Sequence, residues 1–316
     1  MKKTAIIFPG QGSQYVGMGK EFIEADSEAT DLMEMAEEVS GFSLQKLCFA
    51  GPMEDLTRVL HLQPAMTAVN LICFQQFKKA LPDFVPAYTG GHSLGEYSAL
   101  HAAGVLSAED TMTLVTKRGE FMGREGTANP GGMRAILGLT IEDMDCLLRA
   151  YDGPGTVVVA NHNALEQIII SGDQDGLDGF SAICRENGAK KIIPLKVSVA
   201  NHSPLVAGAV DDFAACMDSV GFNTPKIPIL FNVTAAQEQD PAAVRRIMAR
   251  QIASRVQWYA SMNRMIEDGV EVFVELGPKK VLTGMMKKIL PRKSSVQCVQ
   301  ADTPELLQKA VSVIKG

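Results

Sequence analysis

The stretch Gly91-His92-Ser93-Leu94-Gly95 has the residue types and the spacing of an activated serine. A pattern typical of a strand precedes it at 86–91, and a pattern typical of a helix follows it through Leu100. Between a strand and a helix, GxSxG forms a sharp turn that exposes the serine hydroxyl, and the helix N-terminus favours a developing negative charge. We therefore expect Ser93 to be a nucleophile, although a serine that merely caps a helix in a tight turn also fits the pattern.

A nucleophilic serine needs a general base, and the chain has five histidines to supply one. The candidates are His61, His92, His101, His162 and His202. His92 would have to fold back onto its own neighbour, whereas His202 lies just before Ser203-Pro204, where a helix is expected to begin. Loops at the carboxyl ends of parallel strands commonly form active sites. Position favours His202, although an isolated loop histidine is often only a hydrogen-bonded turn residue.

Arg118 is a charged residue on an apolar helix face. The helix is expected to start at the capping box 107–110 and to run to about Arg124. The residues three and four positions away from Arg118 are Leu114, Val115, Phe121 and Met122. A buried guanidinium needs an anion, which is either an internal acid in a salt bridge or the carboxylate of a substrate in a bidentate pair.

The elements that position these residues alternate between strand and helix. A buried-strand pattern at 3–8 ends in a glycine-rich turn, and helical periodicity then covers much of 20–80. Strand patterns return at 229–232 and 270–275, with helical patterns between and after them. This order predicts an α/β fold with a parallel sheet covered by helices.

Residues 126–197 differ in character from the rest of the chain. Strands are expected at 131–138, 156–160, 167–171 and 191–197, with helices after Thr140 and over 174–187. The order βαββαβ predicts a ferredoxin-like small subdomain, inserted into a large subdomain formed by 1–125 and 198–316.

Composition narrows the classes of function. The 316 residues are 46% hydrophobic and 21% charged, with a net charge of -6, so nucleic acid is not expected as the main partner. No apolar stretch approaches the roughly 20 residues that span a bilayer. The six cysteines contain no CxxC pair, which argues against a metal site or a disulfide framework. We expect a cytoplasmic protein with neither a membrane nor a metal requirement.

Taken together, the motifs resemble those of the malonyl-CoA:acyl carrier protein transacylases over about residues 4–290. The matching segments are 8–14 (FPGQGSQ), 62–65 (LQPA), 91–97 (GHSLGEY), 117–119 (KRG), 201–203 (NHS), 250–251 (RQ) with 256–258 (VQW), and 275–278 (ELGP). The resemblance implies an α/β-hydrolase-like large subdomain with a ferredoxin-like small one. It also implies a transfer of malonyl from coenzyme A to the phosphopantetheine thiol of acyl carrier protein, for fatty acid or polyketide synthesis, with no cofactor.

The resemblance further implies roles for individual residues. Ser93 would be the acylated nucleophile and His202 its general base. Gln251 would orient His202 through its backbone carbonyl group, in place of the acidic member of a triad. The backbone N–H groups of Gln11 and Leu94 would form the oxyanion hole.

By the same resemblance, Arg118 would bind the free carboxylate of malonyl. The resemblance therefore implies a substrate carboxylate, not an internal acid, as its partner. This chain departs from the family at Asn201, where members often have Phe or Ser; the position borders the acyl pocket and influences the choice between malonyl and methylmalonyl. It also has Arg255 where a proline is common, with no consequence that the sequence alone predicts.

Local positive charge suggests where an acidic carrier protein and the coenzyme A phosphates dock. The candidate residues are Lys190, Lys191, Lys279, Lys280, Lys287, Lys288, Arg292 and Lys293. A solvated lysine face is an equally good interpretation for any one of them. The competing functions are a serine hydrolase that acts on carrier-protein thioesters and a non-catalytic module that binds the carrier protein.

Overall fold

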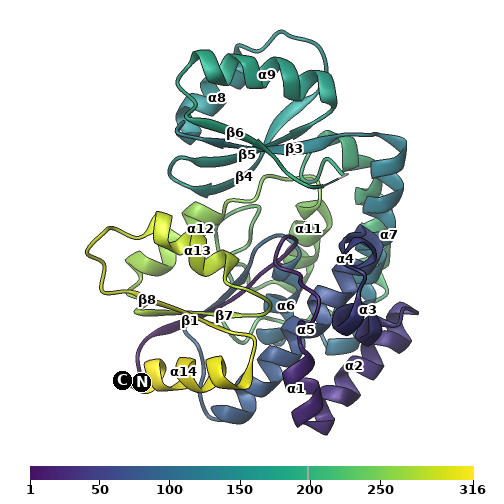
Figure 1. Cartoon of the computed structure of the whole chain (residues 1–316), viewed down its shortest axis with the longest axis vertical. Coiled ribbons are helices and arrows are strands. Elements are labelled where there is room, and N and C mark those ends of the chain that lie inside the picture. Colours follow the sequence, from purple (N-terminus) through teal and green to yellow (C-terminus); the bar gives the residue numbers. More distant parts are fainter. Residues whose placement is uncertain (198) are drawn as a thin grey trace.

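The computed structural model describes residues 1–197 and 199–316 and contains two separate sheets (Figure 1). The first is a four-stranded parallel sheet in the order β2-β1-β7-β8. Its strands are β1 (Thr4–Phe8), β2 (Tyr88–Gly91), β7 (Val272–Leu276) and β8 (Gln297–Ala301). The expected α/β fold with a parallel sheet is confirmed.

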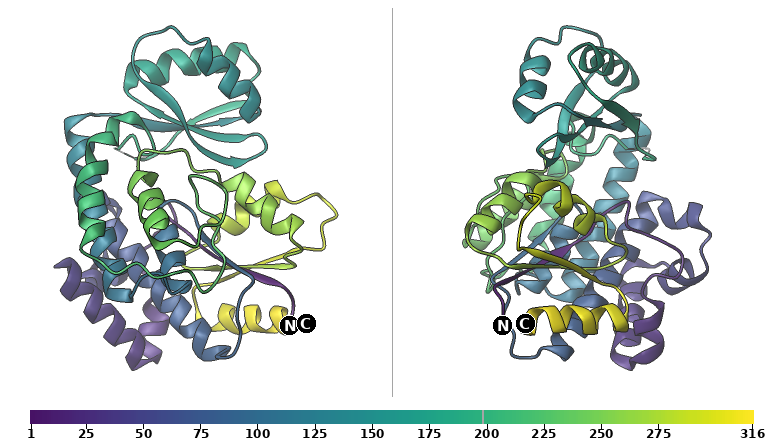
Figure 2. Two further views of the ribbon diagram at one scale, coloured as in Figure 1. Left: turned by 180° about the vertical axis from the view of Figure 1, so that it is seen from behind. Right: turned by 60° about the vertical axis from the view of Figure 1, so that its left-hand side comes forward.

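Helices cover both faces of the parallel sheet. The N-terminal ones are α1 (Lys20–Ala25), α2 (Ser27–Ser40), α3 (Leu44–Ala50), α4 (Met53–Thr57), α5 (Val59–Ala80), α6 (Gly95–Ala102) and α7 (Ala108–Ala128). The C-terminal ones are the 3₁₀ helix η1 (Pro204–Ala209), α10 (Val210–Asp218), α11 (Pro241–Gln251), α12 (Trp258–Glu267), α13 (Val281–Ile289) and α14 (Pro304–Lys315). Figures 1 and 2 show α14 on the face of the sheet opposite to α12 and α13, with the two chain ends side by side.

The alternation of side chains along β1 explains this covering. Ile6 and Phe8 belong to the core that includes α5 and α14, whereas Ala5 and Ile7 belong to the core beneath α12 and α13. A strand that is buried on both faces has a continuous run of apolar residues in its sequence. This is why residues 3–8 predict a strand although apolar and polar residues do not alternate there.

The second sheet is antiparallel, in the order β4-β5-β3-β6. Along the chain its elements are β3 (Gly132–Leu137), α8 (Ile141–Arg149), β4 (Val157–Ala164), β5 (Gln167–Gly172), α9 (Gln174–Glu186) and β6 (Lys191–Pro194). Figure 1 shows α8 and α9 together on the side of this sheet that faces away from the rest of the molecule. The βαββαβ order and this topology are the ferredoxin-like arrangement.

The structure differs from the expected elements in several places. Residues 229–232 form only an isolated bridge between Ile229 and Thr89, made by the bond from the Thr89 N–H to the Pro228 oxygen, because the chain then turns at Phe231. The strand β6 ends at Pro194, which has no N–H to donate. The half-exposed edge strand β8 has no counterpart among the expected elements. Ser203-Pro204 starts the 3₁₀ helix η1 before α10 begins.

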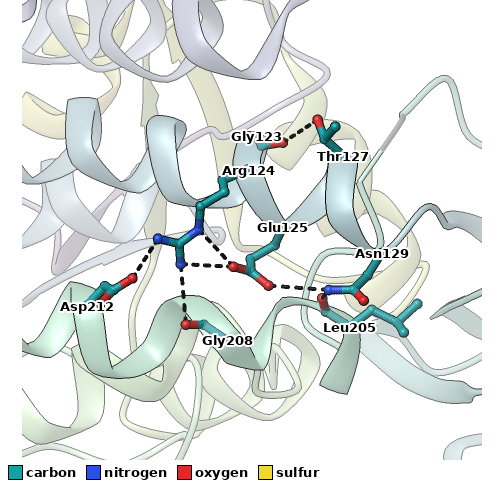
Figure 3. A network of polar contacts seen from close by, with 8 residues as sticks. All are labelled: Gly123, Arg124, Glu125, Thr127, Asn129, Leu205, Gly208 and Asp212. Atoms are coloured by element: carbon teal, nitrogen blue, oxygen red, sulfur yellow. Dashed lines mark hydrogen bonds and ion pairs between the residues drawn. The ribbon is translucent and has the colours of Figure 1, made fainter.

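A polar cluster joins the helix that leaves the parallel-sheet region to the segment that returns to it (Figure 3). The Arg124 guanidinium, at the end of α7, donates to Glu125 and to Asp212 of α10 at 2.6 Å. Asn129 donates to Glu125 at 3.3 Å and to the carbonyl oxygen of Leu205 in η1 at 3.2 Å. We call these residues the α7–η1 clamp; it fixes the segment that directly follows His202.

A second contact links the two sheets through residues 255–256. Backbone bonds join Val256 to Ala160 and His162 of β4 at 2.8 and 2.9 Å. Arg255 pairs with both carboxylate oxygens of Asp145 in α8, at 2.6 and 3.2 Å. Arg255 therefore forms a bidentate ion pair with the helix layer of the small sheet. None of the described helices is both long enough and apolar enough to cross a membrane.

Candidate active site

Ser93 occupies the tight turn between β2 and α6. Its backbone has a φ of 52°, in the left-handed region that L-residues rarely adopt. The turn packs so closely that a Cβ on Gly91 would lie 2.0 Å from the Gly95 backbone, and one on Gly95 would lie 2.1 Å from the carbonyl oxygen of Phe8. Both glycines are therefore sterically required, and the strained turn presents the Ser93 hydroxyl to the site.

His202 lies beside this hydroxyl. Its Nε2 is 2.8 Å from Ser93 Oγ, and its Nδ1 is 3.0 Å from the backbone oxygen of Gln251. Since a carbonyl oxygen only accepts, Nδ1 carries the proton and Nε2 is free to accept one from Ser93. Burial, and then the nearby charge of Arg118, lowers the pKa of His202 to about 3. The imidazole is therefore neutral at ordinary pH, as a general base must be.

The other histidines have different partners. His92 bonds to Asn163 Oδ1 at 2.7 Å, His61 to the backbone oxygen of Asp55 in α4, and His101 to that of Leu106 beyond the end of α6. His162 lies against the ring of Tyr259. Of the sequence candidates, only His202 is hydrogen-bonded to Ser93 among the described residues.

Arg118 points from α7 into the same site and is only 2% exposed. Its Nη1 donates to Gln63 Oε1 at 2.8 Å, and its Nη2 lies 3.2 Å from Ser93 Oγ and 3.3 Å from Gln251 Oε1. Within the described residues, no carboxylate lies at ion-pair distance from the guanidinium, and its Nε has no hydrogen-bond partner. Of the two partners expected from the sequence, the internal salt bridge is absent from the described structure, and the fork faces the Ser93 hydroxyl.

The backbone N–H groups of Gln11 and Leu94 lie on two loops that touch. A Cβ built on Gly10 would lie 3.5 Å from the Leu94 nitrogen and 2.5 Å from the carbonyl oxygen of His92. In the described parts of the chain, neither N–H group has a hydrogen-bond acceptor, whereas the Ser93 N–H donates to Asn232 Oδ1 at 2.8 Å. Unused, adjacent backbone donors beside a nucleophile can stabilise an oxyanion.

The sequence assigns no role to three residues that structure this site: Gln63, Glu96 and Asn232. Glu96 is fully buried and accepts from the Asn232 N–H at 2.6 Å and from Gln251 Nε2 at 2.9 Å. Burial raises the pKa of Glu96 to about 7, against the opposing effect of these hydrogen bonds and Arg118. The available signal for Glu96 was weaker than that for Arg118, since only the following helical neighbours, Ala99 and Leu100, are apolar.

The remaining predicted residues lie as follows. Asn201 is 8% exposed, and its Oδ1 has no hydrogen-bond partner among the described residues. The basic residues proposed for docking are all exposed. The described residues contain no group of three or more His, Cys, Asp or Glu side chains arranged to hold a metal ion.

A strained serine, a neutral histidine and a buried, unpaired arginine define the class of a serine-dependent acyl transferase. Comparison with known proteins agrees: the acyl transferase domain family matches residues 5–305. The malonyl CoA-acyl carrier protein transacylase of Bacillus subtilis (strain 168) is 38% identical over 316 residues, which cover 100% of this chain and 98% of the relative.

Solved structures show the same similarity over the whole chain. The malonyl CoA-acyl carrier protein transacylase of Coxiella burnetii superposes with a TM-score of 0.94 at 30% identity, covering 100% of this chain and 98% of that one. A malonyl-transacylase solved in complex with its type II PKS acyl-carrier protein gives 0.92 at 31% identity, covering 98% and 99%. The chain belongs to the acyl transferase family and, within it, to the malonyl CoA-acyl carrier protein transacylases.

Proposed function

We propose that this chain transfers malonyl from malonyl-CoA to the phosphopantetheine thiol of acyl carrier protein, through an ester on Ser93. The observation that carries the proposal is that the Ser93 hydroxyl lies within hydrogen-bond distance of both the His202 imidazole and the Arg118 guanidinium. The relatives named as malonyl CoA-acyl carrier protein transacylases support the same substrate and acceptor. The product supplies extender units for fatty acid or polyketide synthesis.

In the first half-reaction, Ser93 Oγ attacks the thioester carbonyl carbon while His202 Nε2 takes its proton. The Gln251 carbonyl oxygen holds the Nδ1–H and so stabilises the imidazolium that forms. The N–H groups of Gln11 and Leu94 receive the negative charge of the tetrahedral oxygen. The C–S bond then breaks, His202 returns the proton to sulfur, and coenzyme A leaves as the thiol.

In the second half-reaction, His202 takes the proton of the phosphopantetheine thiol, and the sulfur attacks the Ser93 ester. Collapse of the tetrahedral intermediate breaks the C–O bond, and His202 returns the proton to Ser93 Oγ. Throughout the cycle, Arg118 binds the malonyl carboxylate as a bidentate pair, which fixes the acyl group and explains why this buried cation has no carboxylate at ion-pair distance among the described residues.

A serine hydrolase acting on carrier-protein thioesters is the alternative. A carboxylate-binding arginine gives an editing hydrolase no advantage, and the relatives are transacylases. Malonyl-CoA is a substrate, and we infer that the reaction needs no cofactor because the serine, histidine and arginine supply the nucleophile, the base and the charge.

Further assignments belong to the same proposal. Asn201 borders the acyl pocket and influences the choice between malonyl and methylmalonyl. Residues 126–197 form the small subdomain, and 1–125 with 198–316 the large one. The exposed lysines of α13 dock the acidic carrier protein. A cytoplasmic location fits the six unpaired cysteines.

Radiolabelled malonyl-CoA separates the candidate functions. Stable label on the protein that is lost in Ser93→Ala and is chased onto acyl carrier protein is the expected result. Release of free malonate instead identifies a hydrolase, and absence of label from the wild-type protein identifies a binding module.

A further inference from the structure

We propose that Glu96 is a positioning residue that sets the substrate selectivity of this site by orienting Arg118 through the side chain of Gln251. The inference rests on the proposed binding of the malonyl carboxylate by Arg118 and deepens it. Glu96 touches neither Ser93 Oγ nor the guanidinium by any hydrogen bond among the described residues, so it acts through another residue.

Glu96 is a fully buried carboxylate with two fixed donors. Its Oε1 accepts from the backbone N–H of Asn232 at 2.6 Å, and its Oε2 accepts from Gln251 Nε2 at 2.9 Å. Both of its oxygens act as acceptors here, and each neighbour presents a donor to one of them. A backbone N–H can only donate. The Gln251 side-chain amide could turn either its NH₂ group or its oxygen toward Glu96, and the carboxylate favours the NH₂ group.

The selected orientation determines which atom of Gln251 meets Arg118. With Nε2 held by Glu96 and by the carbonyl oxygen of Ser93 at 2.8 Å, Oε1 is left to accept from Arg118 Nη2 at 3.3 Å. A flipped amide would place an oxygen against two acceptors and an NH₂ against the guanidinium. Glu96 and the carbonyl oxygen of Ser93 therefore both favour the orientation in which Gln251 offers an acceptor to Arg118, and of the two only Glu96 is a side chain that substitution can change.

Arg118 depends on this acceptor because, apart from the Tyr97 ring 5.7 Å from its Cζ, it has few contacts that orient it. Besides Ser93 Oγ, its described hydrogen-bond partners are the side-chain oxygens of Gln63 and Gln251. One oxygen holds Nη1 and the other holds Nη2, so together they fix the plane of the fork beside the nucleophile. Bidentate recognition of a carboxylate is sensitive to that plane, whereas attack on an uncharged acyl group is not.

Asn232 anchors Glu96 to the turn that carries Ser93. Asn232, whose N–H bonds to Glu96, accepts from the Ser93 N–H through Oδ1 at 2.8 Å and donates to the Gly91 oxygen through Nδ2 at 2.8 Å. The carboxylate is thus held relative to the turn that carries the nucleophile. The network ties the orientation of the fork to the position of Ser93.

The test is the substitution Glu96→Gln, which keeps the shape but leaves only one acceptor for two donors. We expect kcat/KM for malonyl-CoA to fall by about ten-fold more than kcat/KM for acetyl-CoA, mainly through a higher KM for malonyl-CoA. In an Arg118→Ala background the same substitution should add little further loss with malonyl-CoA, since the group it orients is gone.

A second variant tests the relay without altering the acid. Gln251→Met removes the side-chain amide but keeps the backbone carbonyl that binds His202, so it should reproduce the malonyl-selective loss. Glu275→Gln is the matched control: Glu275 in β7 is also fully buried, but its carboxylate accepts its two N–H bonds from Leu282 and Thr283 in the first turn of α13. It should leave the ratio of malonyl to acetyl transfer unchanged.

Equal losses with both acyl groups in Glu96→Gln and Gln251→Met, or an undiminished effect of Glu96→Gln in the Arg118→Ala background, would overturn the proposal. A crystal structure of Glu96→Gln gives a readout that does not depend on the reaction. The distance between Arg118 Nη2 and Ser93 Oγ, 3.2 Å in the native protein, should lengthen beyond hydrogen-bond range. An unmoved guanidinium refutes the relay even in a functioning transferase, whereas a wild-type protein that transfers no malonyl refutes only the proposed function.

Discussion

Ser93 and His202 meet through two backbone positions that are both in the left-handed region, with φ values of 52° and 59°. Residues in this region cost free energy, and such strain persists where the surrounding structure imposes it. At Ser93 the close packing of Gly91 and Gly95 imposes it, and at His202 the N–H is bonded to the carbonyl oxygen of Ile252 at 2.9 Å. The backbone conformation at these two positions therefore fixes the short distance between the Ser93 hydroxyl and the His202 imidazole.

At the residue scale, Arg118→Ala should lower kcat/KM for malonyl transfer by about 100-fold, because a charge-assisted pair contributes about 2–3 kcal/mol. Acetyl transfer should be nearly unaffected. Steady-state kinetics with both acyl-CoA substrates measures this. Lys117→Ala, an exposed neighbour that pairs with Glu120, is the control and should change neither rate. Equal losses with malonyl and acetyl would refute the role of Arg118 in carboxylate binding.

The pH dependence follows from the low pKa of His202. The base acts when unprotonated, so with a pKa of about 3 in place of 6.5 the rate of Ser93 acylation by acetyl-CoA should not decline as the pH falls from about 8 to 5. The charge of Arg118 is one cause of the lowered pKa, so Arg118→Ala should raise the pKa of His202. The rate in this variant should therefore begin to decline at a higher pH than in the wild type as the pH falls. Single-turnover rates across this range decide it; an acid limb near 6.5 in the wild type would contradict the assignment.

At the scale of elements, α7 has two tasks: Arg118 lies in the active site, and the clamp at the C-terminal end of the helix holds η1 next to His202. Glu125 is central to this clamp, since it is 8% exposed and accepts from both Arg124 and Asn129. The clamp places the base relative to the helix that carries the arginine.

Glu125→Ala should therefore lower the free energy of unfolding by about 1–3 kcal/mol, because it leaves partly buried donors without their acceptor. Malonyl and acetyl transfer should fall by the same factor, because the base and not the carboxylate-binding group is displaced. Urea denaturation and the two transfer rates measure these effects. Glu120→Ala, an exposed acid on the same helix, should change stability by less than about 0.5 kcal/mol. A wild-type unfolding free energy in Glu125→Ala would refute the clamp.

At the scale of the whole molecule, positive charge gathers on α13 in a chain with a net charge of -6. Charge reversal at Lys287 and Lys288 should raise the KM for acyl carrier protein at low ionic strength and much less at high ionic strength, because salt screens exposed charges. Malonylation of Ser93 by malonyl-CoA should be unaffected. The control reverses Lys20 and Lys46, which are exposed on α1 and α3, away from α13 (Figure 1). An unchanged KM at low salt removes the pair from the docking surface.

The sequence alone determined the features that depend on near neighbours. Apolar runs and capping residues predicted β1, β2 and α7, and the spacing of 91–95 predicted the serine turn, because these patterns are set by a few adjacent residues. Arg118 was identifiable because its helical neighbours are three and four residues away. The tertiary structure decided the rest. Glu96 and Gln251, 155 positions apart, meet only because the C-terminal end of α11 reaches the first turn of α6, and residues 229–232 form a single bridge because of the turn that follows. No local pattern encodes such distances, since they arise from how whole elements pack.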